Sequence, residues 1–203
     1  MDQRTKIVEA GLQILREHGY AGFTQPRVAA LAGLRQSHLT YYHRTRLDLL
    51  AAVGRAAVDQ QLVAVAATFA GLSSVDDAAR ALANLVTRHE NTRVLLALAQ
   101  AGDEEPRLRE MFRELADGII THAGLFLDRI GYAAKGDEGG RLLHAIAVGL
   151  AVVDLATGRP DGKQRAADIL MAALPWMIGT AEQKGPAPRK RRRGASPPVT
   201  SSA

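Results

Sequence analysis

The sequence predicts an all-α protein, in which a small N-terminal unit of three helices is joined by a long helix to a larger helical body. Three observations favour this class. Apolar residues recur at helical spacing along most of the chain. Glycine, proline and acidic residues stand where helices would begin and end. No stretch shows the alternation of apolar and polar residues that is typical of a β-strand.

The first helix is expected from Asp2 to His18. One stripe of this segment is apolar and the other positions are charged or polar, which predicts a helix that packs on its neighbours with one face. Gly19 should end it, and Phe23 is expected to fill the core at the following turn. Arg4 and Lys6, near its start, could reach phosphates.

Residues 24–46 predict two short helices separated by a tight turn at Gly33. Thr24 can cap the first of them and Pro26 falls in its first turn. The second has one apolar anchor, Leu39, and is otherwise polar: Gln36, Ser37, His38, Thr40, Tyr41 and Tyr42. Such a helix is what the DNA major groove accepts and reads. An ordinary two-helix corner with solvated polar faces is the alternative interpretation.

A long helix is predicted from Arg46 to about Phe69. At 1.5 Å per residue it would extend about 35 Å and connect the N-terminal unit rigidly to the body. Its first turn, with Arg44 and Arg46 beside it, is a candidate clamp for a phosphate, because helix N-termini carry free N–H groups and a positive dipole.

Ala32-Gly33-Leu34, Leu39, Arg46 and Leu49-Leu50 together resemble the DNA-binding domain of the TetR family of bacterial regulators. The family usually reads Ala-Gly-Val, five residues, Tyr, two residues, Phe, and then a Lys that opens a long helix. This sequence differs at Thr40, His43 and Arg46, which stand in place of the Tyr, the Phe and the Lys. The resemblance covers the first quarter of the chain.

The resemblance implies that the protein binds double-stranded DNA as a homodimer on a palindromic operator. Base edges would be read by Gln36, His38 and Tyr41. Phosphate or shape contacts are expected from Gln25, Ser37, Thr40, Tyr42, Arg44 and Arg46. Thr24, Arg27 and Arg35 complete the predicted DNA-binding set.

The body is predicted to contain five further helices. They follow Ser74, span Asn91–Ala101, follow Pro106 as far as Ile130, span Arg141–Ala156 and run from about Lys163 to Gln183. The helix over Arg141–Ala156 is apolar almost all round, so it should be buried on several sides. The last two helices would either form the core of a monomer or pack against their copies in a two-fold dimer; the family resemblance favours the dimer.

The resemblance also implies a small effector, apolar or amphipathic, that binds in the body and weakens operator binding, as expected of a ligand-responsive repressor. Residues on the inward face of the expected helices are the candidates for its pocket: Leu85, Phe112, Leu115, Ile119, His122 and Phe126. A DNA-binding or activating protein without an effector, and an α-helical enzyme or interaction module, are the alternative functions.

Charge is distributed unevenly along the chain, whose formal net charge is +5. Residues 1–50 carry a net charge of +3, residues 51–184 a net charge of −3 and residues 185–203 a net charge of +5. We therefore expect a DNA-binding domain over 1–48, an effector-binding and dimerisation domain over 49–184 and a disordered basic tail over 185–203. The tail is either merely solvated or a flexible arm that adds salt-sensitive affinity for DNA.

The sequence offers no pattern for catalysis, a metal site or a cofactor. There is no cysteine, no glycine-rich phosphate loop and no pair of histidines one helical turn apart. The N-terminus lacks the apolar core of a signal peptide, and no uninterrupted apolar run reaches the roughly 20 residues of a membrane span. We therefore expect a soluble, cytoplasmic protein without enzymatic activity.

Overall fold

The structure is a computed structural model that describes residues 2–130 and 138–182. This part of the chain contains nine helices and no strand. The helices are α1 (Gln3–Gly22), α2 (Gln25–Leu31), α3 (Gln36–Tyr42), α4 (Arg46–Ala70), α5 (Val75–Val86), α6 (His89–Ala101), α7 (Pro106–Arg129), α8 (Glu138–Thr157) and α9 (Gly162–Glu182). The predicted all-α class is confirmed. The predicted basic tail lies outside the described residues.

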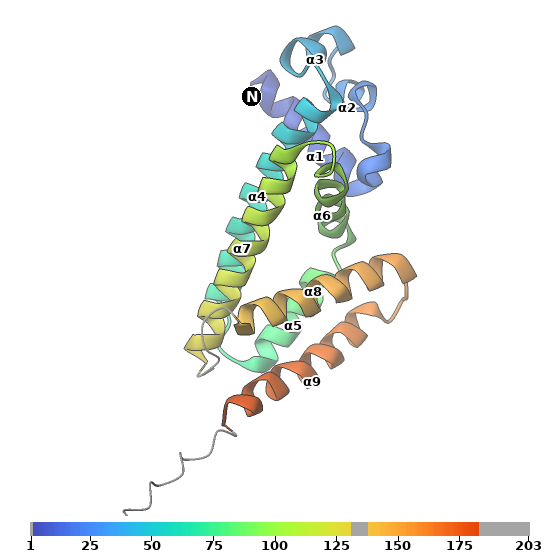
Figure 1. Cartoon of the computed structure of the whole chain (residues 1–203). Coiled ribbons are helices and arrows are strands. Elements are labelled where there is room, and N and C mark those ends of the chain that lie inside the picture. Colours follow the sequence, from blue (N-terminus) through green and yellow to red (C-terminus); the bar gives the residue numbers. More distant parts are fainter. Residues whose placement is uncertain (1, 131–137, 183–203) are drawn as a thin grey trace, which may run out of the picture.

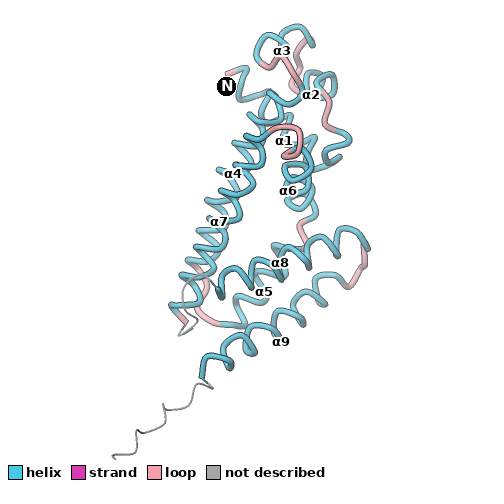
Figure 2. Tube along the Cα trace, viewed as in Figure 1, coloured by secondary structure: helices cyan, strands magenta, loops and turns pink. Residues whose placement is uncertain are grey.

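Three short or medium helices, α1 to α3, form one end of the molecule, and α4 and α7 run side by side away from it (Figure 1). Helix α6 lies along α1, whereas α5, α8 and α9 pack together at the opposite end (Figures 1 and 2). With 25 residues, α4 extends about 37 Å and reaches from one end to the other. The predicted rigid connection is therefore present.

Helix α1 continues past its predicted end. Gly19 does interrupt the helix, with φ +64° and ψ −165°, but a further turn follows and the helix ends at Gly22. Phe23 is fully buried next to it, as expected of a core residue at this turn. Helix α2 begins three residues after the end of α1, at Gln25.

Two buried clusters make up the core. The first joins α1–α4 to α6 and the start of α7, with Ile7, Leu39 and Leu98 among its fully buried residues. The second joins the end of α4 to α5, α7, α8 and α9 around Phe126. Because the first cluster includes both α1 and α6, the apolar core does not divide at the expected domain boundary between residues 48 and 49.

Side-chain caps begin two helices of the body, α5 and α7. The Ser74 hydroxyl accepts a hydrogen bond from the Asp77 N–H (3.1 Å), and the Glu105 carboxylate accepts one from the Arg107 N–H (3.2 Å). Helix α6 begins at His89, earlier than the expected Asn91, and ends before Gly102 as predicted. The cap at Ser74 and the stop at Gly102 were readable because both depend on nearby residues alone.

Helix α8 is far less buried than its apolar sequence predicts. Within one chain it buries Gly139, Gly140, Leu143 and Ala151, while Leu142 and Val153 are exposed. It approaches α7 closely at Gly140, where a side chain would collide with the backbone oxygen of Ile120. By length and composition alone α4 and α8 could each cross a membrane, a test that core helices of soluble proteins also pass. The expectation that α8 is buried on several sides is wrong for the single chain.

Candidate DNA-binding surface and effector cavity

The turn between α2 and α3 is closed by backbone hydrogen bonds around Gly33. The Leu34 N–H donates to the Ala29 oxygen (2.9 Å) and the Gly33 N–H donates to the Ala30 oxygen (3.1 Å). Gly33 has φ +69°, a value that side chains disfavour. This double closure sets the angle at which α3 leaves α2.

Helix α3 packs on the core through one buried residue and exposes most of its polar side chains. Leu39 is fully buried, whereas Tyr41 is 83% exposed. The exposed polar residues of α3 are Gln36, Ser37, His38, Thr40 and Tyr41. The helix lies at the outer end of the molecule (Figure 1). A short helix with an open polar edge at one end of a molecule can enter the major groove of DNA.

Tyr42 is half-buried and joins α3 to α1. Its ring lies edge-on to Tyr41, with 5.3 Å between the centroids, and the Arg4 guanidinium lies 5.6 Å from its centroid. Its hydroxyl is 3.5 Å from Oε1 of Gln3. The start of α1, including the exposed Arg4, therefore lies beside α3. The sequence suggested phosphate reach for Arg4 but gave no sign of this contact.

Besides Tyr42, three predicted DNA-binding residues of α2 and α3 form hydrogen bonds within the protein through their side chains. Gln25 donates from Nε2 to the His43 oxygen (2.8 Å), and Arg27 donates from Nη1 to the Gly22 oxygen (3.3 Å). The Thr40 hydroxyl donates to the Gln36 oxygen (2.9 Å). Thr24 stands at the N-cap of α2, but its side chain makes no cap hydrogen bond. The Gln25 bond joins the start of α2 to the end of α3, whereas the Arg27 bond joins α2 to α1 and the Thr40 bond lies within α3.

Arg46 points into the protein. Its Nε donates to the Phe23 oxygen (2.8 Å), its Nη2 donates to the Tyr20 oxygen (2.6 Å), and its guanidinium stacks 4.1 Å from the Tyr20 ring centroid. The sequence predicts a phosphate contact here because Arg46 carries a positive charge at the start of a helix, where free N–H groups and the helix dipole favour phosphates. In this geometry the Arg46 side chain stabilises the end of α1 and the turn that follows it, through the backbone oxygens of Tyr20 and Phe23. The neighbouring Arg44 is exposed.

The N-terminus of α4 already holds an anion of the chain itself. Thr45 and Asp48 form a reciprocal capping box: the Asp48 N–H donates to the Thr45 hydroxyl (2.9 Å), and the Thr45 N–H donates to the Asp48 carboxylate (3.2 Å). The Thr45 hydroxyl and Arg107 lower the pKa of Asp48. The Thr-x-x-Asp spacing was a readable signal for this cap. It engages the N–H groups of Thr45 and Asp48, which are then not free for a phosphate.

His43 stands where the family usually has Phe, and its side chain is partly buried. Its Nε2 is buried and makes no hydrogen bond with any described residue. Burial lowers the pKa of His43, opposed by Asp48 and assisted by Arg4. The imidazole is therefore neutral at pH 7 and occupies, as an aromatic ring, the site where the family usually has Phe.

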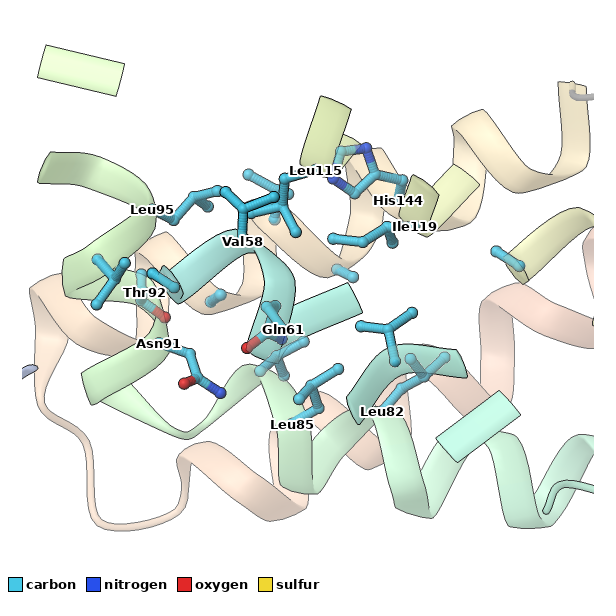
Figure 3. A pocket seen from close by; sticks show the side chains of 18 of the residues that line it. Val58, Gln61, Leu82, Leu85, Asn91, Thr92, Leu95, Leu115, Ile119 and His144 are labelled. Carbon is cyan, nitrogen blue, oxygen red and sulfur yellow. The ribbon is translucent and has the colours of Figure 1, made fainter. Parts of the chain in front are cut away.

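An apolar cavity of about 110 Å³ lies where α4, α5, α6, α7 and α8 meet, and Arg16 of α1 also lines it. Of the six residues predicted from helical facing, Leu85, Leu115 and Ile119 line it (Figure 3). Phe112, His122 and Phe126 do not. Phe112 packs against the first core cluster, and Phe126 is buried in the second, with its ring centroid 5.8 Å from that of Phe69.

The cavity wall contains a few polar side chains outside the predicted set of six. Gln61 on α4 and Asn91 and Thr92 on α6 lie near one another, whereas His144 on α8 lies apart from them beside Ile119 (Figure 3). Burial lowers the pKa of His144, so this ring is neutral at pH 7. The rest of the described wall is mainly Val, Leu, Ile and Ala. An apolar space with a few polar groups can bind a small organic molecule.

Helix α6 touches both the cavity and the DNA-binding unit. Asn91, Thr92 and Leu95 line the cavity, and the same helix packs along α1. Arg93 of α6 donates from Nη1 to the Arg16 oxygen of α1 (3.1 Å). A displacement of α6 would therefore also displace α1.

This arrangement defines a helix-turn-helix DNA-binding protein whose helical body contains a cavity. Residues 7–53 match the family described as "Bacterial regulatory proteins, tetR family". The chain is 30% identical over 142 residues to the HTH-type transcriptional regulator CymR of Pseudomonas putida, across 63% of this chain and 70% of CymR. The chain belongs to the TetR family and is a DNA-binding transcriptional regulator.

Solved structures share this fold over nearly their whole length. A transcriptional regulator from Rhodococcus sp. Rha1 matches with a TM-score of 0.71 at 24% identity, over 87% of this chain and 96% of that one. The multidrug binding protein EbrR, in complex with imidazole, matches with a TM-score of 0.64 at 23% identity, over 94% and 99%. A TetR-family member from Streptomyces coelicolor A3 matches with a TM-score of 0.64 at 23% identity, over 88% and 99%.

Proposed function

We propose that this regulator is a ligand-responsive repressor. It binds a palindromic operator as a homodimer and releases it when a small effector enters the cavity of the body. The observation that carries this proposal is the position of α6, which lines the cavity on one side and packs along α1 on the other. An effector that fits the cavity better after a shift of α6 would favour the DNA-free arrangement.

Base reading is assigned to Gln36, His38 and Tyr41 on α3. All three are exposed, and none of their side chains makes a hydrogen bond to another described residue. Phosphate and shape contacts are assigned to Arg35, Ser37, Thr40, Tyr42 and Arg44. Gln25 and Arg46 position the helices instead, because their side chains are bonded to backbone oxygens.

Dimerisation is assigned to α8 and α9. Both helices expose large apolar side chains in the single chain: Leu142, Val153, Ile169 and Met171. Between Leu142 and Val153 the exposed face of α8 carries Ala145 and Gly149, and open space surrounds the Gly149 Cα. Small residues permit close helix approach, so two copies of this face could form a four-helix interface. Two α3 helices would then meet two half-sites one DNA turn apart.

Effector binding is supported by the cavity and by a relative. EbrR has been solved in complex with imidazole and also with proflavin, the latter matching this chain with a TM-score of 0.61. For this chain we propose an apolar or amphipathic small molecule, because the described wall is mainly aliphatic. Such a regulator would act in the cytoplasm, where bacterial DNA lies.

The test is a footprint on DNA upstream of the protein's own coding region, with and without a panel of small organic compounds. We expect a protected palindrome that at least one compound releases. A protected site that no compound affects, together with no compound that raises the melting temperature, would favour a regulator without an effector. Absence of any duplex binding at low salt would contradict the DNA-binding proposal itself.

A further inference from the structure

The wall of the cavity is mainly aliphatic and carries almost no charge. None of the described residues on it is Asp, Glu or Lys, and burial lowers the pKa of His144, so that this ring is neutral at pH 7. Arg16 also lines the cavity, but its Nη2 donates to the side chain of Gln60 at 3.2 Å. Both residues line an outer polar groove together with three glutamates, so the negative charges near Arg16 are those of the groove. An ion inside the cavity would lose its water without gaining a counter-charge.

Three polar side chains interrupt this aliphatic wall and have no partner in the described part of the chain. Gln61 of α4 and Asn91 and Thr92 of α6 lie near one another (Figure 3). None of the three side chains makes a hydrogen bond to another described residue. Thr92 is 4% exposed, so its side chain is cut off from bulk water and lines the cavity. A buried hydroxyl without a partner costs free energy, which a polar atom of a ligand can recover.

The volume of the cavity limits the size of its ligand. At about 110 Å³ it is somewhat smaller than the ~150 Å³ apolar cavity that accepts benzene, so a single ring fits if the wall yields slightly. The three polar groups come from α4 and α6, whereas Leu85 of α5 and Leu115 and Ile119 of α7 are among the apolar residues of the wall (Figure 3). A ring with one polar group at its end would match both parts of the wall.

We propose that the effector is an uncharged molecule of about one ring that carries a hydroxyl or carbonyl group. That group binds to Gln61, Asn91 and Thr92, and the ring lies among the aliphatic side chains of α4, α5, α6 and α7. This inference rests on the proposed effector cavity and adds the charge of the ligand and the residues that hold its polar group. Thr92 precedes Arg93, whose side chain bonds to the Arg16 oxygen, so the ligand is held at the part of α6 that contacts α1.

Benzyl alcohol, toluene, benzoate and benzylammonium test it, because the four share a ring and differ in charge and polarity. Their dissociation constants are measured by calorimetry on the full chain at pH 7.5. We expect benzyl alcohol to bind most tightly. Benzoate and benzylammonium should bind at least about a hundredfold more weakly, since an unpaired ion in an apolar space is strongly disfavoured. Toluene should bind about three- to tenfold more weakly, since it leaves the three polar groups without a partner.

Two variants assign the preference for benzyl alcohol to the polar groups. Thr92→Val keeps the shape of the side chain and removes the hydroxyl. Benzyl alcohol should therefore bind about three- to tenfold more weakly, whereas toluene should lose no affinity. Gln61→Met removes the amide and should act in the same direction. A change in the shape of the cavity alone would weaken both ligands alike.

Two control variants separate the cavity from its surroundings. Thr87→Val makes the same substitution at a hydroxyl that donates to the Ala83 oxygen (2.8 Å) and does not line the cavity. Arg80→Met removes an exposed charge from α5, whose other face lines the cavity. Both variants should leave all four dissociation constants unchanged. A melting curve of each variant checks that it is folded.

Several outcomes would overturn the proposal. These are binding of benzoate, benzylammonium or toluene as tight as that of benzyl alcohol, an unchanged preference for benzyl alcohol over toluene in Thr92→Val, or binding of none of the four. Failure of the proposed function gives a different result. If benzyl alcohol binds through Thr92 but leaves the operator complex intact, the ligand class stands and the repressor mechanism falls. If another compound releases the operator and benzyl alcohol does not bind, the repressor mechanism stands and the ligand class falls.

Discussion

Arg93 on α6 donates a hydrogen bond from Nη1 to the backbone oxygen of Arg16 on α1, over 3.1 Å. This contact joins a helix that lines the cavity to the first helix of the DNA-binding unit. Two residues that lie 77 positions apart in the sequence therefore fix the joint between the sensing and the reading parts of the molecule.

Arg93→Met should weaken this joint. We expect the variant to bind the operator, but the factor by which a saturating effector weakens that binding should fall several-fold, because α6 transmits less of its displacement to α1. Operator affinity is measured by fluorescence anisotropy with and without a compound that releases the wild-type complex. Arg80→Met is the control with unchanged response. An unaltered factor in Arg93→Met would refute the coupling role.

Gln36→Ala should reduce specific binding far more than non-specific binding. If Gln36 reads a base edge, its loss costs about 1–3 kcal/mol on the operator and little on random duplex. Arg35→Ala should instead weaken both DNAs about equally and lower the salt dependence by about one phosphate contact. Titrations on the two duplexes at several salt concentrations separate the roles. Equal losses on both DNAs for Gln36→Ala would exclude base reading.

Arg46 and Arg44 should behave in opposite ways although they are neighbours. Arg46→Met leaves the carbonyls of Tyr20 and Phe23 without their donor, so we expect unfolding free energy to fall by about 1–3 kcal/mol. Arg44→Met should leave stability nearly unchanged and weaken DNA binding in a salt-sensitive way. Urea unfolding and DNA titration of both variants check this. A fully stable Arg46→Met with weakened DNA binding would restore the phosphate role.

Val153→Asp should dissociate the dimer. Val153 is 57% exposed on α8 of the single chain, and a charge buried there against a second copy would be unpaired. Val63→Asp is the matched control: Val63 is 71% exposed but lies on α4, which is not part of the proposed interface. Sedimentation equilibrium should give a monomer for the first variant and a dimer for the second. A dimer in both cases would move the interface elsewhere.

His43→Phe should stabilise the protein, and more so in acid. Burial lowers the pKa of His43 in the folded chain, so below the unfolded value of about 6.5 the unfolded chain binds a proton that the folded chain refuses. The penalty is absent at pH 7.5 and grows as the pH falls through 6.5 toward the folded pKa. Phe also removes the unpaired Nε2, which should add about 1 kcal/mol at any pH.

Urea unfolding of wild type and His43→Phe at pH 7.5 and pH 5.5 measures this difference. The lowered pKa of His144 acts in the same direction in both proteins and cancels in the comparison. A stabilisation that is smaller at pH 5.5 than at pH 7.5 would contradict the sign assigned to His43.

The prediction of six cavity residues shows what helical periodicity can and cannot predict. Leu115, Ile119 and Phe126 share one face of α7, as the spacing indicated, but that face crosses both core clusters and meets the cavity only in between. Periodicity identifies the buried side of a helix, whereas the neighbouring helices decide which part of that side is packed and which part lines a space. The contact between Arg4 at the start of α1 and Tyr42 could not be predicted from the sequence for the same reason, because it depends on how two distant helices pack.

The sequence by itself determined the helices, the tight turn at Gly33 and the outward polar residues around Leu39. Each of these depends on groups within a few residues, such as a glycine that can take positive φ or a single apolar anchor in a polar helix. Only the tertiary structure decided that Arg46 faces inward, that Arg16 lines the cavity and that α8 remains exposed in one chain. Those facts depend on contacts between segments far apart in the chain, and a side chain's own neighbours in sequence do not specify its partner.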